Sequence, residues 1–353
     1  MKRVFVGLSG GVDSSVTAAL LQQRSYDVTG VYMKNWTQDL PGFACPWKED
    51  YQDAKRVAVK LDIPLLVFDF ESEYRQKVVD YMIDEYKAGR TPNPDIMCNQ
   101  EIKFRLFLEA SLEKGADMIA TGHYARVQDG RLHVAANAAK DQTYFLYRVT
   151  RQAMGRTLMP IGEFATKDEV RRVASEFGLA TATKKDSQGI CFVGKVGIKE
   201  FLAQYVETEP GDIVDQHGRT IGRHDGAIFY TVGQRHGLNV GGGLPYYVTH
   251  KDMDTNQVFV TTDIHDEKLW AKRVLLRDVH WIGTQPGKGA TYQARLRYRG
   301  PLVVVTLDSQ DDPAALMLTL QDEQRALAAG QSAVLYLGDE VIGGGVISQV
   351  YAQ

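Results

Sequence analysis

Short apolar runs alternate with apolar residues at helical spacing over the first 205 residues. The runs have the length and β-branched content of buried strands, and they fall at 4–8, 28–32, 65–68 and 118–120. Between them, apolar residues recur every three or four positions, as in Val12, Val16, Ala19 and Leu20. Such alternation predicts an α/β fold with a doubly wound, mostly parallel sheet and helices on both faces.

Two later helices follow the same spacing rule. One is marked by Ile102, Leu106 and Ala110. The other is marked by Val170, Val173, Ala174 and Phe177, and Gly178 is its stop signal.

The pattern changes after about residue 205. From Pro210 onward helical spacing fades, and glycine and β-branched residues become frequent. Runs such as 303–305 and 333–336 predict strands. We expect an α/β domain at 1–205, a central β-rich domain at 206–268 and a C-terminal β-barrel at 269–353.

Composition limits the partners and the location. The chain has 353 residues, enough for two or three domains, and its net charge is −3, so any surface for nucleic acid must be local. Lys2 and Arg3 precede an apolar stretch that is too short for a signal peptide. Since we also find no segment long and apolar enough to span a bilayer, we expect a cytoplasmic protein without a membrane partner.

The three cysteines are Cys45, Cys98 and Cys191, and none lies in a Cys-x-x-Cys pair. This spacing gives little support to a structural zinc site or an iron–sulfur cluster. The odd count argues against a secreted disulfide framework. A lone cysteine is most often a small buried apolar residue, and this remains our interpretation of Cys45.

Ser9-Gly10-Gly11-Val12-Asp13-Ser14 follows the first strand and opens the first helix. Glycines let backbone amides approach a phosphate, and the helix N-terminus adds unsatisfied N–H groups and positive potential. Asp13 could hold magnesium. The segment is not a Walker A loop, because no Gly-Lys-Ser/Thr ends it. The alternative is a strand–helix turn with incidental glycines.

The loop resembles the pyrophosphatase loop of enzymes that cleave ATP to AMP and pyrophosphate, such as NAD synthetase, GMP synthetase and tRNA lysidine synthetase. Further segments narrow the choice: 91–99, which carries Cys98, 121–124, 140–142, 186–192, which carries Cys191, and 233–238. Together these segments resemble the bacterial tRNA-specific 2-thiouridylases over nearly the whole chain. Leu8, where the family commonly has methionine, and Thr143, where it commonly has serine, are small departures.

The resemblance implies an adenine nucleotide α-hydrolase-like catalytic domain of ATP pyrophosphatase type at 1–205 and a tRNA-binding barrel at 269–353. It also implies a persulfide on Cys191, a second catalytic cysteine at Cys98, and an acid or base at Asp95. The implied ATP-binding residues are Gly7, Leu8, Ser9, Gly10, Gly11, Val12, Asp13, Ser14, Met33 and Gly122. The implied contacts to the target base and tRNA are Asn93, Pro94, Asp95, His123, Lys140, Asp141, Gln142, Arg297, Tyr298 and Gln331.

The implied cofactors are ATP and Mg²⁺. The implied partners are tRNAs of the Lys, Glu and Gln type with a wobble uridine, and a cysteine desulfurase or sulfur-relay protein as persulfide donor. The chemistry is coherent, because adenylation turns a uracil oxygen into a leaving group, and a persulfide needs a second thiol to accept the disulfide. The main alternative is another pyrophosphatase-loop synthetase or amide ligase, in which Cys98 and Cys191 are ordinary core residues. A second is a non-enzymatic RNA-binding protein.

Two basic clusters have open interpretations. Lys184, Lys185 and Lys195 flank Cys191, where they could favour its thiolate or form a solvated loop. A basic run with interleaved aromatic residues extends from Lys272 to Arg299 and suits phosphate contacts and base stacking. Alternation from Arg295 to Arg299 predicts that these arginines share one strand face.

Overall fold

The computed structural model describes residues 1–40, 44–185, 197–241, 243, 245–308 and 315–352. The chain divides into two compact units. The N-terminal unit comprises 1–79, 94–196 and 339–342, and the C-terminal unit comprises 80–93, 197–338 and 343–353. No helix in the described part of the chain is long and apolar enough to cross a membrane.

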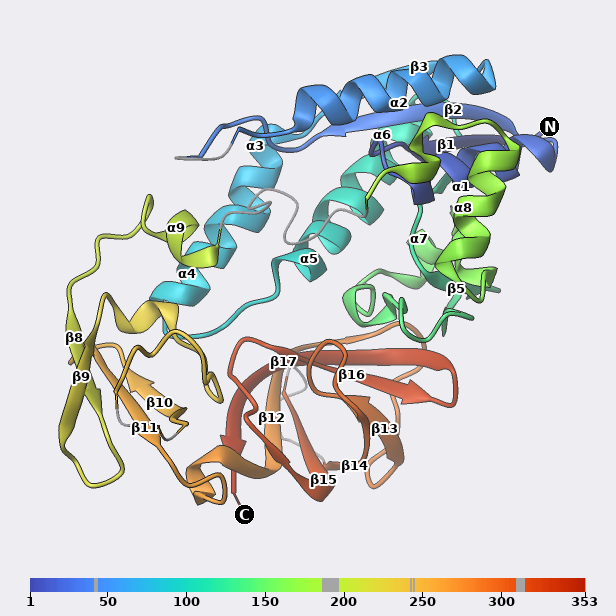
Figure 1. Ribbon diagram of the computed structural model, residues 1–353. Coiled ribbons are helices and arrows are strands. Elements are labelled where there is room, and N and C mark those ends of the chain that lie inside the picture. The colour runs from blue at the N-terminus through green and yellow to red at the C-terminus, as the bar shows by residue number, and fades with distance from the viewer. Residues whose placement is uncertain (41–43, 186–196, 242, 244, 309–314, 353) are drawn as a thin grey trace. The chain divides into compact units, whose positions relative to one another are not determined.

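A five-stranded parallel sheet forms the centre of the N-terminal unit (Figure 1). Its strand order is β3 (Leu65–Asp69), β2 (Asp27–Lys34), β1 (Arg3–Gly7), β4 (Met118–Ala120) and β7 (Thr157–Leu158). Because the order reverses direction on either side of β1, the carboxyl end of β1 is the switch point where ligands of open α/β sheets bind.

Alternate side chains of β1 face opposite layers. Val4 and Val6 pack into the core that α1 (Val12–Gln23), α2 (Trp47–Leu61) and α8 (Lys167–Glu176) cover. Gly7 faces Phe107 of α6 (Phe107–Glu113) on the other side. Helices therefore cover both faces of the sheet, and the predicted α/β class is confirmed.

The remaining helices of the N-terminal unit are short or irregular. The part of this unit that the structure describes contains two π-helices, η1 (Arg75–Asp80, whose last residue belongs to the C-terminal unit) and η2 (Cys98–Leu106). The α-helices are α3 (Glu71–Tyr74), α5 (Pro94–Met97) and α7 (Arg151–Met154). The 3₁₀ turns are η3 (Thr143–Phe145), η4 (Pro160–Glu163) and η5 (Ala180–Thr183).

An antiparallel hairpin, β5 (Ala125–Gln128) and β6 (Arg131–Val134), follows β4. Asp129 and Gly130 both have positive φ, which suits its two-residue turn. Strand β6 also pairs with residues 340–341, which belong to the N-terminal unit.

The described residues of the C-terminal unit form two β structures. A four-stranded sheet has the order β10 (Tyr247–Asp252), β11 (Gln257–Thr261), β8 (Gly211–Val214) and β9 (Thr220–His224). A second structure has the order β12 (Trp270–Trp281), β15 (Leu316–Arg325), β14 (Leu302–Asp308), β13 (Thr291–Arg295), β16 (Ser332–Leu337) and β17 (Glu340–Tyr351, whose first three residues belong to the N-terminal unit). Since β12 pairs with both β15 and β17, these six strands close into the predicted barrel.

An ion cluster around the buried Glu85 joins α4 (Tyr81–Lys87) to the barrel within the C-terminal unit. Arg90 and Arg277 donate to the Glu85 carboxylate at 2.6 and 2.8 Å. Burial alone would raise the pKa of Glu85, but these hydrogen bonds outweigh it and lower that pKa. The unit also contains α9 (Ile198–Leu202), η6 (Ala227–Phe229) and η7 (Glu267–Leu269).

Candidate active site

The Ser9–Ser14 loop lies at the carboxyl end of β1, directly before α1. Ser9 N–H donates to Ser14 Oγ at 3.2 Å, and Ser14 Oγ donates to the Gly11 carbonyl at 3.1 Å. Gly10 has φ +73°, and a Cβ there would clash with the Asp50 carbonyl. Gly11 caps α1 without a side chain, so its first-turn amides are left for an outside acceptor. The loop is shaped to hold an anion.

The other predicted ATP-binding residues surround this loop. A Cβ on Gly122 would lie 2.7 Å from Ser14 N, so only glycine lets this segment pack against the first turn of α1. A Cβ on Gly7 would lie 3.0 Å from Met33 Cε. Leu8 and Val12 are buried, and the Leu8 N–H already donates to the Val31 carbonyl at 2.8 Å.

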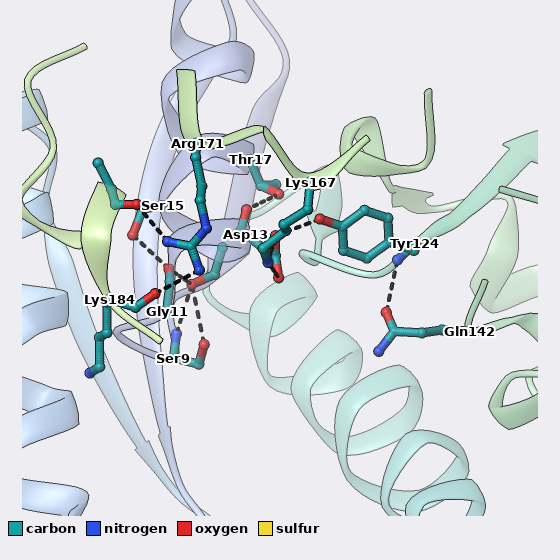
Figure 2. A network of polar contacts seen from close by, with 12 residues as sticks. Ser9, Gly11, Asp13, Ser15, Thr17, Tyr124, Gln142, Lys167, Arg171 and Lys184 are labelled. Atoms are coloured by element: carbon teal, nitrogen blue, oxygen red, sulfur yellow. Dashed lines mark hydrogen bonds and ion pairs between the residues drawn. The ribbon is translucent and has the colours of Figure 1, made fainter. Parts of the chain in front are cut away.

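Asp13 is held by two residues that the sequence analysis did not select as site residues. Lys167 Nζ lies 2.7 and 2.8 Å from the two carboxylate oxygens, and Tyr124 Oη donates to Oδ1 at 3.0 Å. Both side chains point toward Asp13 from segments far apart in the sequence (Figure 2). Thr166 and Glu169 form a capping box that begins α8 at Lys167. A cation is unfavourable at the first residue of a helix, and this is the sequence signal that could have marked Lys167 as a site residue.

Asp13 is a candidate magnesium ligand because it belongs to the Ser9–Ser14 loop. Mg²⁺ in proteins usually keeps several waters and takes one or two carboxylates together with substrate phosphates. Within the described ranges, no group of three or more His, Cys, Asp or Glu side chains is placed to hold a metal. Asp13 has the carboxylate chemistry for a phosphate-bound ion, but in this structure both of its oxygens pair with Lys167.

Asp95 and Cys98 lie on consecutive helical segments. Asp95 belongs to α5, and Cys98 is the first residue of η2 and is buried. Burial raises the pKa of Asp95, and the positive charge of Lys103 opposes this rise. In a π-helix, hydrogen bonds join residues five apart, so Lys103 lies one π-turn after Cys98. A carboxyl group of raised pKa near a thiol suits proton transfer.

His123 and Gln142 are held from within the N-terminal unit. His123 is buried and its Nδ1 lies 2.8 Å from Thr121 Oγ1. Burial, helped by Lys103, holds the pKa of His123 well below its ordinary value, so the ring is neutral at pH 7. Gln142 Oε1 accepts from Tyr124 N–H at 2.8 Å.

Asp141, predicted to contact tRNA, has its carboxylate inside the fold. The side chain is buried and accepts from Ala135 N–H at 3.1 Å and from Thr143 Oγ1 at 2.7 Å. Its tRNA contact stays a prediction, and its observed bonds shape the segment between Lys140 and Gln142.

Cys191 and Lys195 lie outside the described residues. Lys184, described just before them, lies 2.8 Å from Asp50 Oδ1 and 2.6 Å from Asp53 Oδ2. Burial alone would lower the pKa of Lys184, but these two bonds raise it. Its charge is thus neutralised locally by α2, which argues against a thiolate-stabilising role for this lysine.

The basic run in the C-terminal unit is less continuous than its sequence suggests. Arg277 pairs with Glu85, and Arg295 lies over the Tyr336 ring at 5.5 Å, so both have partners within the fold. The predicted alternation along one strand face is wrong, because β13 ends at Arg295. After Arg295, Gly300 N–H donates to the Arg297 carbonyl in a turn. Pro301 follows this turn, and a proline has no N–H to donate to a neighbouring strand.

Arg297 remains exposed on this turn, next to half-buried Tyr298. Arg299 is also exposed and lies over the Tyr298 ring at 5.2 Å. Gln331 lies elsewhere on the barrel, where its Nε2 donates to the Thr91 carbonyl at 2.8 Å. The turn after β13 is thus basic and aromatic, whereas the side-chain N–H of Gln331 is engaged internally.

Three family models match consecutive parts of the chain. They are the tRNA methyl transferase HUP domain at 2–195, the tRNA methyl transferase PRC-barrel domain at 199–262 and the aminomethyltransferase beta-barrel domain at 271–347. The tRNA-specific 2-thiouridylase MnmA of Bacillus subtilis strain 168 is 45% identical over 99% of this chain and 95% of its own length. The chain belongs to the tRNA-specific 2-thiouridylase family.

Other members show the same extent of similarity. The 2-thiouridylases of Shouchella clausii strain KSM-K16 and Staphylococcus aureus strain RF122 are 46% and 43% identical over 99% of this chain. The matches cover 98% and 96% of their own lengths. This membership confirms the resemblance seen in the sequence and favours the thiouridylase interpretation over another pyrophosphatase-loop ligase.

Proposed function

We propose that this protein is a tRNA-uridine 2-sulfurtransferase that uses ATP to replace the 2-oxygen of a wobble uridine with sulfur. The observation that carries the proposal is the 45% identity to a tRNA-specific 2-thiouridylase over 99% of the chain. The phosphate loop and the Asp95–Cys98 helix supply the two chemistries that such a reaction needs. The reaction releases AMP and pyrophosphate.

ATP binds at the Ser9–Ser14 loop, with its phosphates on the first-turn amides of α1. Lys167, 2.7 Å from Asp13, stands beside the loop as a cation for the charge that develops as pyrophosphate leaves. Gly7, Met33 and Gly122 complete the nucleotide site. Mg²⁺ would be held by Asp13 and would neutralise phosphate charge.

The sulfur step follows activation of the base. The uracil O2 attacks the α-phosphorus of ATP, and pyrophosphate leaves. The terminal sulfur of a persulfide on Cys191 then attacks C2, and the C2–O2 bond breaks as AMP departs with O2. The Cys98 thiolate attacks Cys191 Sγ, which releases the thiouridine and leaves a Cys98–Cys191 disulfide. A cellular dithiol reductant restores both thiols.

Asp95 moves protons at the target base in this scheme. Its carboxyl group has a raised pKa, so it exchanges a proton more readily near neutral pH than an exposed aspartate does. Asn93 and Pro94, its neighbours in the chain, shape the pocket for the base. His123 is neutral and contributes a hydrogen bond rather than a charge.

The macromolecular partners follow from the substrate. The tRNAs are those of the Lys, Glu and Gln type, which are contacted by Lys140, Asp141, Gln142, Arg297, Tyr298 and Gln331. A cysteine desulfurase or a sulfur-relay protein loads Cys191, and the reaction takes place in the cytoplasm. We assign the catalytic domain to 1–205, the central domain to 206–268 and the tRNA-binding barrel to 269–353.

A reconstituted reaction tests this function. Unmodified tRNA of the Lys type, ATP, Mg²⁺, L-cysteine and a cysteine desulfurase are incubated with the protein, and the nucleosides are analysed by mass spectrometry. We expect 2-thiouridine at the wobble position in the complete mixture and none without ATP. Absence of 2-thiouridine from the complete mixture would contradict the proposal, provided that a known 2-thiouridylase thiolates the same tRNA.

A further inference from the structure

Tyr124 is bonded both to the phosphate loop and to the segment between Lys140 and Gln142. Its hydroxyl donates to Asp13 Oδ1 at 3.0 Å. Its backbone N–H donates to Gln142 Oε1 at 2.8 Å (Figure 2). Its carbonyl accepts from Gln142 N–H at 2.9 Å. We propose that Tyr124 is a positioning residue that couples tRNA binding at Gln142 to ATP binding at the loop. This inference rests on the proposed function.

The connection between Tyr124 and the loop is stiff. Tyr124 is 3% exposed, and the Lys167 ammonium lies 5.5 Å from the centre of its ring. Gly122, two residues earlier, packs so closely on Ser14 that even a Cβ would lie 2.7 Å from the Ser14 nitrogen. Because close-packed groups transmit displacement, a shift of Tyr124 reaches Asp13.

The connection between Tyr124 and the RNA side is also fixed. Both amide hydrogen bonds join Tyr124 to Gln142, and the buried Asp141 carboxylate holds the same segment through Ala135 and Thr143. Gln142 Nε2 has no hydrogen-bond partner among the described residues. The amide of Gln142 therefore offers its donor to RNA while its acceptor stays on Tyr124.

The Asp13 carboxylate is shared by Lys167 and Tyr124, and tRNA would bias this sharing. In this structure the carboxylate of Asp13 is shared, with Lys167 at 2.7 and 2.8 Å and Tyr124 at 3.0 Å. Lys167 has a second candidate anion, a phosphate at the loop. When tRNA fixes Tyr124 on Asp13, Lys167 is more easily released from Asp13 to the phosphate. Binding of tRNA and binding of ATP thus both favour the arrangement in which Lys167 contacts the phosphate.

Binding measurements with an ATP analogue isolate this coupling from the chemistry. The dissociation constant of tRNA is measured with and without saturating α,β-methylene ATP and Mg²⁺, for the full chain and for Y124F. In the unsubstituted protein we expect the analogue to tighten tRNA binding by about fivefold or more. In Y124F, which keeps the ring near Lys167 and loses only the hydroxyl, we expect the factor to fall close to one.

Two further variants separate coupling from folding. Tyr26→Phe is the matched control, because Tyr26 is partly buried in the same unit and has no side-chain hydrogen bond to the described residues. We expect Tyr26→Phe to keep the full factor. Gln142→Leu should lose it, and the double variant with Y124F should lose nothing more, because both changes break one connection. A purely structural loss would weaken both ligands and leave their coupling factor intact.

The outcomes distinguish this inference from the proposed function. A full coupling factor in Y124F overturns the role of Tyr124, as does a factor of one in the unsubstituted protein. Either result is compatible with a protein that still makes 2-thiouridine in the reconstituted reaction. A protein that shows coupling and makes no 2-thiouridine contradicts the proposed function instead.

Discussion

Lys167 places a positive charge at the first residue of α8, where the backbone N–H groups of the first turn disfavour a cation. Both oxygens of the Asp13 carboxylate compensate for this by pairing with its ammonium. A residue that breaks a local rule and is stabilised by a distant partner is typical of functional sites. A search for local motifs does not find Lys167, because it lies 154 positions from its partner Asp13.

Substituting Lys167 tests its part in ATP activation. In Lys167→Met we expect tRNA-dependent AMP formation to fall by about 100-fold, because a positioned charge near developing negative charge is commonly worth that much. AMP release is measured with radiolabelled ATP. Arg172→Met is the control, since Arg172 is an exposed cation of the same helix, and it should retain full activity. A Lys167→Met rate within threefold of the unsubstituted rate would contradict the assignment.

The pH dependence tests Asp95. Burial raises the pKa of Asp95 and Lys103 opposes the rise, so Lys103→Met should raise that pKa further. If ionised Asp95 is the active form, the acidic limb of the rate–pH profile moves to higher pH in Lys103→Met. In Lys103→Arg, which keeps the charge, the limb should stay in place. Single-turnover thiolation from pH 5 to pH 8 measures both. A limb that shifts to lower pH in Lys103→Met would contradict this electrostatic account.

At the scale of elements, the type of helix that carries Cys98 could not be predicted from the spacing of apolar residues. Ile102, Leu106 and Ala110 predicted a helix, and a helix is present, but residues 98–106 form a π-helix. The spacing does not distinguish these geometries, because residues four apart lie near one face in both. Only the structure shows that Lys103 follows Cys98 by one π-turn.

Other elements could be predicted because residues close in the sequence determine each of them. The strand at 4–8, the helix that Gly178 ends and the β-rich second half follow from apolar period and turn residues. The phosphate loop follows from glycines at a strand–helix junction. The end of β13 at Arg295 depends instead on the turn before Pro301, and the partner of Lys184 lies on distant α2. Such long-range contacts leave no signal in local spacing.

The capping box of α8 gives an element-scale test. Thr166 Oγ1 accepts from Glu169 N–H at 3.2 Å, and Glu169 Oε2 accepts from Thr166 N–H at 3.2 Å. In Thr166→Ala we expect a loss of about 1 kcal/mol in the unfolding free energy of the N-terminal unit. Urea denaturation followed by circular dichroism measures this loss. Thr166→Ser keeps the hydroxyl and should lie close to the unsubstituted protein; equal losses in both variants would point to the methyl group instead.

For the molecule as a whole, RNA binding has to come from local charge, because the net charge of the chain is −3. Arg277 pairs with Glu85 and Arg295 lies against Tyr336, so the exposed residues of the basic run are better candidates for RNA contacts. Arg297 is exposed on the turn after β13. A phosphate contact is therefore better expected from Arg297 than from these two neighbours.

Salt dependence of tRNA binding tests this assignment. In Arg297→Ala we expect weaker binding and a log–log salt slope smaller by about 0.7 to 0.9, the change for one lost phosphate contact. The dissociation constant is measured by fluorescence anisotropy over a series of KCl concentrations. Lys60→Ala removes an exposed charge outside the basic run and should leave the slope unchanged. A slope that is unaltered in Arg297→Ala would mean that Arg297 contacts no phosphate.

Oxygen tracing tests the central claim, activation of the uracil 2-oxygen by adenylation, most directly. An anticodon stem-loop carries ¹⁸O at the 2-position of its wobble uridine, and it is incubated with the protein, unlabelled ATP, Mg²⁺ and the sulfur-loading mixture. The account predicts that each 2-thiouridine formed is matched by one AMP that is two mass units heavier, because O2 leaves on the phosphate. Unlabelled AMP, with ¹⁸O recovered in water while 2-thiouridine accumulates, would contradict it.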